Sequence, residues 1–303
     1  MKVFITGASG YIGGSLAAAL QKEGHRVRGL TRSEPVAKQL TTLGIEPVIG
    51  ELDDAQLLTH EAAEADLVIN TANADHRGAV EALINGLENS GKRLIHTSGT
   101  SIVGDDARGD FCSEVIFSED SQLIVDPRKQ ARREIDLLVM GATRQGVHSN
   151  VIIPSLIYGF GTGIHKDSIQ VPFLIKNALD KGAVQIVGKG LNVWSNIHID
   201  DLVTLYLAAA KAAPAGAFYF AENGEASFRD VAEAIARRLS IAKIEQLPVE
   251  EAENLWGMAR ARFTFGSNCR VRAVRARNEL NWKPVHASVQ NWILSEYQSD
   301  GLN

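Results

Sequence analysis

Three glycines near the N-terminus, Gly7, Gly10 and Gly13, are spaced to hold a phosphate group. They follow the apolar run VFIT and precede an Ala-rich helical stretch, so a strand, a tight turn and a helix start succeed one another. Gly7 would permit the turn, Gly10 a close approach to a pyrophosphate, and Gly13 close helix–strand packing. The helix N-terminus adds free N–H groups and a positive dipole end. The motif predicts dinucleotide binding, with a flexible turn as the plain alternative.

The end of the second predicted strand bears on the choice of cofactor. In NAD-binding proteins of this type, an acidic residue there holds the ribose 2′-hydroxyl. The stretch HRVRGLTRSEP has Thr31 at that place, followed by Arg32 and Ser33. A guanidinium can bind a 2′-phosphate through two hydrogen bonds, and the serine can add another donor. We therefore expect NADP(H) rather than NAD(H), and a solvated surface role for Arg32 is the alternative.

Short apolar runs alternate with helical patterns over the first half of the chain. The runs span 2–6, 25–31, 46–50, 66–72 and 93–98. Helical patterns include 11–24, 78–91 and 128–146, and a further strand is expected at 149–155. Strands joined by helices of this length form right-handed β-α-β units. The sequence therefore predicts an α/β fold, a Rossmann-type doubly wound parallel sheet of about six or seven strands.

The pattern changes after Tyr158, where a Gly-rich loop begins. We predict a dinucleotide-binding Rossmann domain over 1–158 and a smaller, mainly substrate-binding lobe over 159–303, interleaved with the last strands of the sheet. Substrate binds at the carboxyl ends of the strands in open α/β sheets. The loops 99–111, 159–170 and 189–196 would therefore line the substrate site, with the second as a candidate lid.

Composition excludes several classes of function. The 303 residues are 45% hydrophobic and 22% charged, with a net charge of -5 and no Lys/Arg tract, so nucleic acid is not an expected partner. Two isolated cysteines, Cys112 and Cys269, are too few for a metal framework, and no metal is expected. Lys211 and Pro214 interrupt the most apolar segment, which argues against a membrane span. With no signal segment, a cytoplasmic location is expected.

Several motifs, in order along the chain, resemble those of the short-chain dehydrogenase/reductase superfamily, in its extended, epimerase/dehydratase-like or atypical branches. They are TGASGYIGG at 6–14, GELDD at 50–54, INTA at 69–72, IIPSLIYGFGTG at 152–163, WSNIHIDDL at 194–202 and ELNWKP at 279–284. The resemblance implies a set of cofactor-binding residues. They are Gly7, Ser9, Gly10, Tyr11, Ile12, Gly13, Arg32, Ser33, Glu51, Leu52, Thr71, Ala72, Thr97 and Pro154.

Catalysis in that superfamily rests on a Ser or Thr, a Tyr and a Lys four residues after the Tyr. The corresponding region, 118–139, contains no tyrosine. Aligning the family's downstream acidic position with Asp136 puts Arg128 in the Tyr position and Arg132 in the Lys position. Aligning it with Glu134 gives Asp126 and Gln130 instead. Neither alignment restores the pair, so the catalytic set is expected to be non-standard.

The remaining candidates for chemistry are hydroxyls, an arginine and a distant tyrosine. Ser98 and Thr100 flank Gly99, which falls at the family's catalytic serine position, although both could instead only bond to backbone or cofactor. Arg132 could hold the cofactor ribose in place of the Lys, and it could stabilise an oxyanion but not act as an acid. Tyr158 is a candidate acid. Lone histidines such as His165 and His198 are usually structural.

Two functions follow from these residues. The first is an NADP(H)-dependent oxidoreductase, either a carbonyl reductase or an epimerase/dehydratase-like enzyme, acting on a small molecule that is expected to be a carbonyl compound. The second is a catalytically inactive NADP(H)-binding sensor or regulatory protein, which the missing Tyr and Lys favour. The chain is expected to be a monomer or a homodimer. In the resemblance, dimers form through helices near 78–90 and 127–146.

Overall fold

The computed structural model describes residues 1–297, and its centre is one parallel sheet. The strands of this sheet are β1 (Lys2–Thr6), β2 (Arg26–Thr31), β3 (Glu46–Ile49), β4 (Leu67–Asn70), β5 (Arg93–Thr97), β6 (His148–Pro154) and β10 (Phe218–Ala221). They lie in the order β10-β6-β5-β4-β1-β2-β3, and every neighbouring pair is parallel. The predicted doubly wound parallel sheet of about six or seven strands is confirmed, with seven strands.

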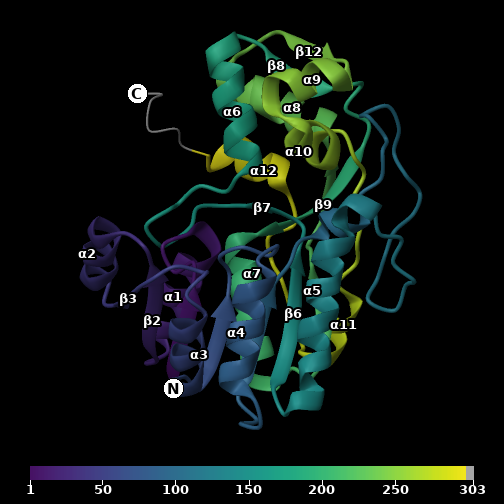
Figure 1. Cartoon of the computed structure of the whole chain (residues 1–303). Coiled ribbons are helices and arrows are strands. Elements are labelled where there is room, and N and C mark those ends of the chain that lie inside the picture. Colours follow the sequence, from purple (N-terminus) through teal and green to yellow (C-terminus); the bar gives the residue numbers. More distant parts are fainter. Residues whose placement is uncertain (298–303) are drawn as a thin grey trace.

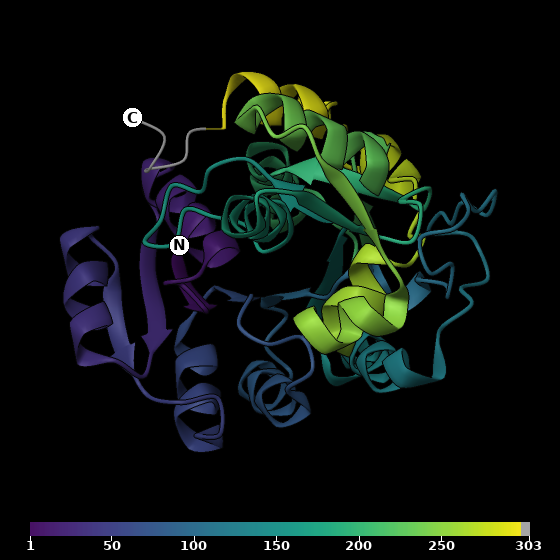
Figure 2. The ribbon, with the colours of Figure 1, turned by 90° about the horizontal axis from the view of Figure 1, so that it is seen from above.

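Helices cover both faces of this sheet, as the view from above shows (Figure 2). One layer contains α3 (Ala55–Glu64), α4 (Arg77–Leu87) and α5 (Gln130–Gly141). The other contains α1 (Tyr11–Lys22) and α7 (Ile199–Ala212), and α2 (Glu34–Thr42) lies beside β3 at one edge. The helix expected over 128–146 is divided into three parts. A 3₁₀ turn, η2 (Pro127–Lys129), precedes α5, and another, η3 (Ala142–Gln145), follows it.

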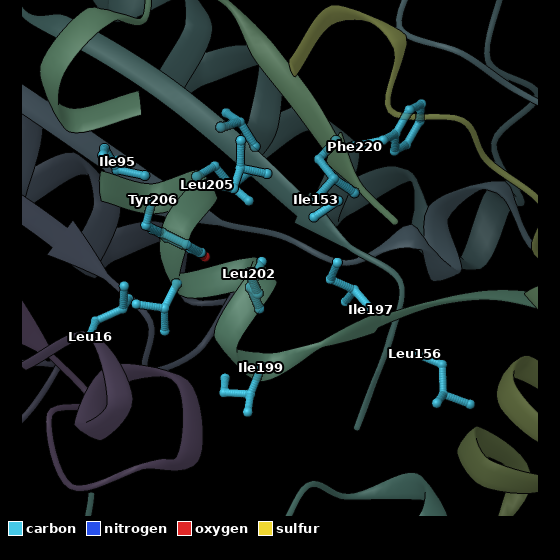
Figure 3. Packing of buried hydrophobic residues seen from close by; sticks show 14 of the residues in the cluster. Leu16, Ile95, Ile153, Leu156, Ile197, Ile199, Leu202, Leu205, Tyr206 and Phe220 are labelled. Atoms are coloured by element: carbon cyan, nitrogen blue, oxygen red, sulfur yellow. The ribbon is translucent and has the colours of Figure 1, made fainter. Parts of the chain in front are cut away.

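The core of the sheet lies under α7, whose apolar side chains cover the central strands. Leu202, Leu205 and Tyr206 of this helix lie close to Ile95 of β5 and Ile153 of β6 (Figure 3). All five are almost fully buried. Helices on both faces explain why the strands read as continuous apolar runs rather than alternating ones.

The remaining elements form the second region of the molecule, above the sheet in Figure 1. Its strands are β7 (Leu156–Tyr158), β8 (Val184–Val187), β9 (Val193–His198), β11 (Glu225–Ser227) and β12 (Ile244–Leu247), and its main helices are α6 (Gln170–Lys181), α8 (Phe228–Leu239), α9 (Val249–Trp256) and α12 (Val289–Ser295). Shorter pieces are η1 (Thr100–Val103), α10 (Met258–Arg260) and the π-turn η4 (Ala261–Phe265). A further short helix, α11 (Val274–Glu279), lies at the level of the sheet, against β10 (Figure 1). The boundary at residue 158 remains a prediction, because α7 and β10 return to the sheet from beyond it. Over residues 1–297, no helix has the length and apolar character needed to cross a bilayer.

Buried polar side chains link the carboxyl ends of the three central strands. Thr6 Oγ1 donates to Asn70 Oδ1 at 2.5 Å, and Asn70 Nδ2 lies 3.0 Å from His96 Nδ1. Burial lowers the pKa of His96 to about 4, so the imidazole is neutral at pH 7 and Nδ1 can accept this bond. We call Thr6, Asn70 and His96 the polar row. It fixes β1, β4 and β5 relative to one another at the edge where α/β sheets bind ligands.

One carboxylate holds the C-terminal segment against the sheet. Asp201, in the first turn of α7, accepts the backbone N–H groups of Val285 and His286 at 3.0 and 2.8 Å. The carbonyl of the same residue accepts the indole N–H of Trp282 at 3.0 Å. Asp201 is buried, whereas its neighbour Asp200 is exposed.

Replacing Asp201 by Ala should lower the free energy of unfolding by about 2–4 kcal/mol, because two backbone donors lose their acceptor. Urea denaturation followed by circular dichroism would measure the change. Asp200→Ala is the matched control and should cost less than about 1 kcal/mol, since it removes only an exposed charge near the helix N-terminus. Equal losses in the two variants would contradict the role given to Asp201.

Candidate functional site

At the glycine turn between β1 and α1, the backbone of Gly7 lies close to the backbone that follows β4. Gly7 has a φ of +77°, and a Cβ there would lie 3.0 Å from the backbone of Thr71 and Ala72. A Cβ at Gly13 would collide with the Gly7 carbonyl oxygen and with Thr71 Oγ1. Only glycine fits these two positions without displacement. The turn thus leaves the first N–H groups of α1 free to meet a phosphate, as the dinucleotide expectation requires.

The loop after β7 is fastened to the start of α1. The Tyr11 hydroxyl donates to the carbonyls of Tyr158 and Gly159 at 3.0 and 2.8 Å. Ser15 Oγ accepts the backbone N–H of Thr162 at 3.2 Å. Tyr11 therefore holds the loop after β7 against the start of α1, and its hydroxyl proton is already engaged with these two carbonyls.

A cavity of about 420 Å³ opens on one side of the glycine turn, and we call it the Arg32 cavity. Seven of the predicted cofactor residues line it, namely Gly7, Ser9, Arg32, Ser33, Glu51, Leu52 and Ala72. The guanidinium of Arg32 is exposed and makes no ion pair or hydrogen bond with residues 1–297. Ser33 caps α2 by accepting the Val36 N–H, so its own hydroxyl proton is free. Both groups can meet an anion at this place.

A second cavity, of about 460 Å³, lies on the other side of the turn, and we call it the Arg132 cavity. Its lining includes the cofactor candidates Gly10, Tyr11, Ile12, Gly13, Thr71 and Pro154 and the catalytic candidates Ser98, Thr100 and Arg132. The three loops expected around the substrate each contribute, through Thr100, Ser168 and Trp194 among others. Ile157, Ile169 and Phe263 add apolar walls. The hydroxyls of Ser98 and Thr100 are buried in this lining and have no hydrogen-bond partner of ordinary geometry among residues 1–297.

Arg132 is held in this cavity by a carboxylate. Its Nε and Nη2 donate to the two oxygens of Asp75 at 2.7 and 2.5 Å, and Nη1 donates to Ser101 Oγ at 3.3 Å. The hydrogen bond from Arg132 lowers the pKa of the Asp75 carboxyl below its usual range. The pair ties α5 to the connection between β4 and α4. Asp75 and Ser101 were not among the predicted site residues, because nothing in their sequence surroundings marks them.

Lys129 also lines the Arg132 cavity, and the sequence reasoning missed it. Counting four residues back from Arg132, the spacing of the family pair, pointed to Arg128. The structure instead turns Arg128 toward Asp126, with Nη2 to Oδ2 at 2.6 Å. Lys129 is the N-cap of α5 and lies three residues before Arg132, and residues three apart lie on the same side of a helix. Pro127, which begins the 3₁₀ turn η2, was the available signal.

Other candidates lie outside both cavities. The Tyr158 hydroxyl is buried and donates to the carbonyl of His286 at 3.0 Å, and burial raises the pKa of this phenol far above 10. Thr97 is buried against Tyr206, with the two hydroxyl oxygens 2.6 Å apart. His165 is exposed in the loop after β7, and His198 caps α7. Tyr158 therefore has no path to a ligand in the Arg132 cavity.

One cluster of side chains could hold a metal ion. The ligand atoms of His198, Asp200 and His286 lie within 4.8 Å of one another. Nδ1 of His198 already accepts the backbone N–H of Asp200 at 3.2 Å, and the rings of His198 and His286 stack with centroids 4.0 Å apart. These contacts account for the arrangement through hydrogen bonding and stacking alone.

A buried carboxyl lies behind Ser98 in the wall of the Arg132 cavity. Asp136 of α5 is fully buried, and neither of its oxygens has a hydrogen bond of ordinary geometry with residues 1–297. Arg133 Nη1 is 3.9 Å from Oδ2. Burial raises the pKa of Asp136 to about 6, more than the nearby Ser98 hydroxyl and Arg133 lower it.

Comparison with known proteins relates the chain to dinucleotide enzymes. The family model described as "NAD dependent epimerase/dehydratase family" matches residues 3–219. An oxidase named ucsJ from Acremonium sp is 32% identical over 94% of this chain and 93% of its own length. A 2-alkyl-3-oxoalkanoate reductase from Stenotrophomonas maltophilia is 29% identical over 74% of this chain and 71% of its own. Among solved structures, dTDP-glucose 4,6-dehydratase from Bacillus anthracis in complex with NAD matches with a TM-score of 0.75 and 19% identity, covering 97% of this chain and 95% of that one.

The raised pKa of Asp136 predicts a pH-dependent stability. In the unfolded chain this carboxyl titrates near 3.8, so the folded state holds its proton more tightly. The corresponding stabilisation is complete below pH 3.8 and is lost as the pH rises through about 6, by about 3 kcal/mol in all.

Asp136→Asn removes this penalty. The free energy of unfolding of the variant minus that of the native chain should therefore increase between pH 4 and pH 7, by up to about 3 kcal/mol. Urea denaturation at a series of pH values measures it. Glu134→Gln, on the same helix but exposed, is the control and should show a nearly constant difference. A difference that falls with rising pH in Asp136→Asn would contradict a raised pKa.

Proposed function

The chain belongs to the NAD dependent epimerase/dehydratase family, and we propose that it is an NADP(H)-dependent oxidoreductase that reduces the carbonyl group of a small molecule. One observation carries the proposal. The Arg132 cavity adjoins the glycine turn, and combines free hydroxyls, cationic groups and apolar walls in about 460 Å³. Cofactor candidates form only part of this lining, and a protein that only sensed the cofactor would not need the remaining part, to which the three loops expected around the substrate contribute.

The choice of NADP(H) rests on the Arg32 cavity. Arg32 and Ser33 offer two donors in the place where NAD-binding proteins of this type use a carboxylate. Glu51 and Asp53 also line this cavity, but Arg32 forms an ion pair with no residue among 1–297. The dTDP-glucose 4,6-dehydratase structure named above contains NAD. The preference of this chain for NADP(H) is therefore proposed from its own residues Arg32 and Ser33. The curated relative that reduces a 3-oxoalkanoate supports a ketone as the class of substrate.

In this proposal, residues of the Arg32 cavity bind the cofactor phosphate, and residues of the Arg132 cavity interact with the substrate carbonyl. The N–H groups at the start of α1 would bind the pyrophosphate, and Arg32 with Ser33 the 2′-phosphate. When bound, the reduced nicotinamide supplies a hydride to the substrate carbon. Ser98 and Thr100 would donate hydrogen bonds to the carbonyl oxygen, and the Arg132 guanidinium would stabilise negative charge developing there.

An inactive NADP(H)-binding sensor is the second candidate, and a specific observation favours it. Tyr11 is the one tyrosine that lines the Arg132 cavity among residues 1–297, and its hydroxyl is engaged with two carbonyls. Absorbance measurements of NADPH loss over a panel of ketones and aldehydes separate the two functions. Turnover of any member supports the enzyme, whereas tight NADPH binding with no turnover on the whole panel supports the sensor.

Replacing Arg32 by Ala should weaken NADPH binding by about 10- to 100-fold, because a charge-assisted contact to the 2′-phosphate is lost. NADH binding should change by less than about 3-fold, since NADH lacks that phosphate. Fluorescence titration with both cofactors gives the four constants. Arg26→Ala, an exposed arginine at the opposite end of β2, is the matched control. A native chain that binds NADH as tightly as NADPH would overturn the assignment.

Replacing Arg132 by Met should weaken NADPH and NADH to the same extent, by about 10-fold, if the guanidinium holds the nicotinamide ribose that both share. The same titration measures this, with the exposed Arg144→Met as control. Unchanged affinity for both cofactors would remove Arg132 from the cofactor site and leave it a role toward the substrate alone.

A further inference from the structure

Lys129 supplies the Arg132 cavity with a cation that has no anionic partner. Its ammonium makes no ion pair and no hydrogen bond with residues 1–297, and its Nζ lies 4.8 Å from the ring centroid of Phe263. Arg132, the other cation of the lining, is neutralised by both oxygens of Asp75. Among residues 1–297, no Asp or Glu lines this cavity. The ammonium of Lys129 therefore meets hydroxyl and amide groups in the lining but no anionic acceptor.

The position of Lys129 follows from the local backbone. Asp126 begins η2 by accepting the Arg128 N–H, and Pro127 fixes the first residue of that turn. The turn places Lys129 one residue before α5, where it lines the same cavity as Arg132, Ser98 and Thr100. Its side chain is half-buried, with apolar Phe263 below it. The ammonium is thus held at the wall rather than extended into solvent.

The charges around Lys129 make its proton easier to remove. Burial lowers the pKa of the ammonium, and the guanidinium of Arg132 lowers it further. Asp75 and Asp126 oppose this shift, and Arg128 adds to it, so that the pKa remains below the ordinary lysine value. An acid whose pKa approaches the working pH transfers its proton more effectively.

We propose that the Lys129 ammonium is the proton donor to the substrate oxygen, an inference that rests on the proposed function. As the carbonyl carbon gains a hydride from the reduced nicotinamide, the C=O π pair moves to oxygen. That oxygen takes a proton from Lys129 Nζ and becomes the hydroxyl of the product. The neutral amine then takes a proton from water, which restores the ammonium. One hydride and one proton are consumed for each carbonyl reduced.

The other groups of the cavity are less suited to this step. Arg132 cannot release a proton near neutral pH, and the Tyr11 hydroxyl is engaged with two carbonyls. Ser98 and Thr100 can donate hydrogen bonds, but a serine or threonine alkoxide left behind would be strongly disfavoured. Among the described residues of this lining, Lys129 combines a removable proton with an ammonium that has no hydrogen-bond or ion-pair partner.

Two substitutions test the proposal on the full chain with NADPH and a ketone that the native protein reduces. Lys129→Met should lower kcat by about 100- to 10,000-fold, the usual contribution of a general acid, while NADPH affinity changes by less than about 2-fold. Lys129→Arg should lose as much, because arginine keeps the charge but not the removable proton. Lys181→Met, the same change on exposed α6, should leave kcat unchanged.

The pH profile adds a readout that a structural role would not move. In the native protein kcat should fall as the pH rises through the pKa of Lys129, and this limb should be absent from the residual activity of Lys129→Met. Competitive acylation followed by mass spectrometry measures the same pKa without turnover. It should give Lys129 a pKa below the ordinary lysine value, and an ordinary value would overturn the proposal.

The outcomes distinguish proton donation by Lys129 from the proposed carbonyl reduction on which it rests. A native protein that reduces no member of the carbonyl panel overturns both. A native protein that does reduce a ketone, with Lys129→Arg equally active, overturns only the proton transfer and leaves Lys129 as a charge. An unchanged kcat in Lys129→Met would likewise overturn only the proton transfer. Loss in both variants, with NADPH binding intact, supports the donor.

Discussion

The contact between the start of α1 and the carboxyl edge of the central strands is the constraint on which both cavities depend. Gly13 meets the Gly7 carbonyl where no side chain could fit, and Thr71 Oγ1 donates to the Thr6 carbonyl at 2.7 Å just beside it. Below this contact the polar row holds β1, β4 and β5 in register. The Arg32 cavity and the Arg132 cavity are therefore the two sides of a single rigid turn. For a ligand that spans the turn, the binding cavities for its two ends are already positioned relative to each other.

The electrostatics of the Arg132 cavity are set by a few residues around the start of α5. Asp75 reaches across from the β4–α4 connection and neutralises Arg132, while Asp126 withdraws Arg128 from the cavity. What remains is one unneutralised cation, Lys129, beside free hydroxyls. Asp136, deeper in the same helix, keeps its proton to a higher pH than an ordinary carboxyl, so it adds little negative charge to the wall in mildly acidic solution. The lining thus carries one unpaired positive charge, that of Lys129, because Arg132 is paired with Asp75.

Much of the fold could be predicted from the sequence, because strand runs, helix patterns and the glycine turn are local signals. The residues 2–6 and 11–24, for example, carry their assignment in their own periodicity and glycines. Thirteen of the fourteen predicted cofactor residues line one of the two cavities, although their contacts with a cofactor are still predictions. The positions of the other site candidates depend on tertiary geometry, which local patterns do not carry. Tyr158 has the right residue type, but its hydroxyl donates to the carbonyl of His286. Lys129 lines the cavity three residues before Arg132, whereas Arg128 pairs with Asp126.

The return of β10 to the sheet has a consequence for how the chain is made. This strand pairs with β6, and the α7 helix that covers β5 and β6 comes just before it, so the sheet is completed by residues 199–221. While the ribosome has delivered only the first half of the chain, β6 has an open edge and the central strands have one uncovered apolar face. These contacts are distant in sequence, and closing them is slow relative to helix formation. The nascent protein therefore passes through a stage at which it depends on protection from aggregation, and that stage ends only when β10 emerges.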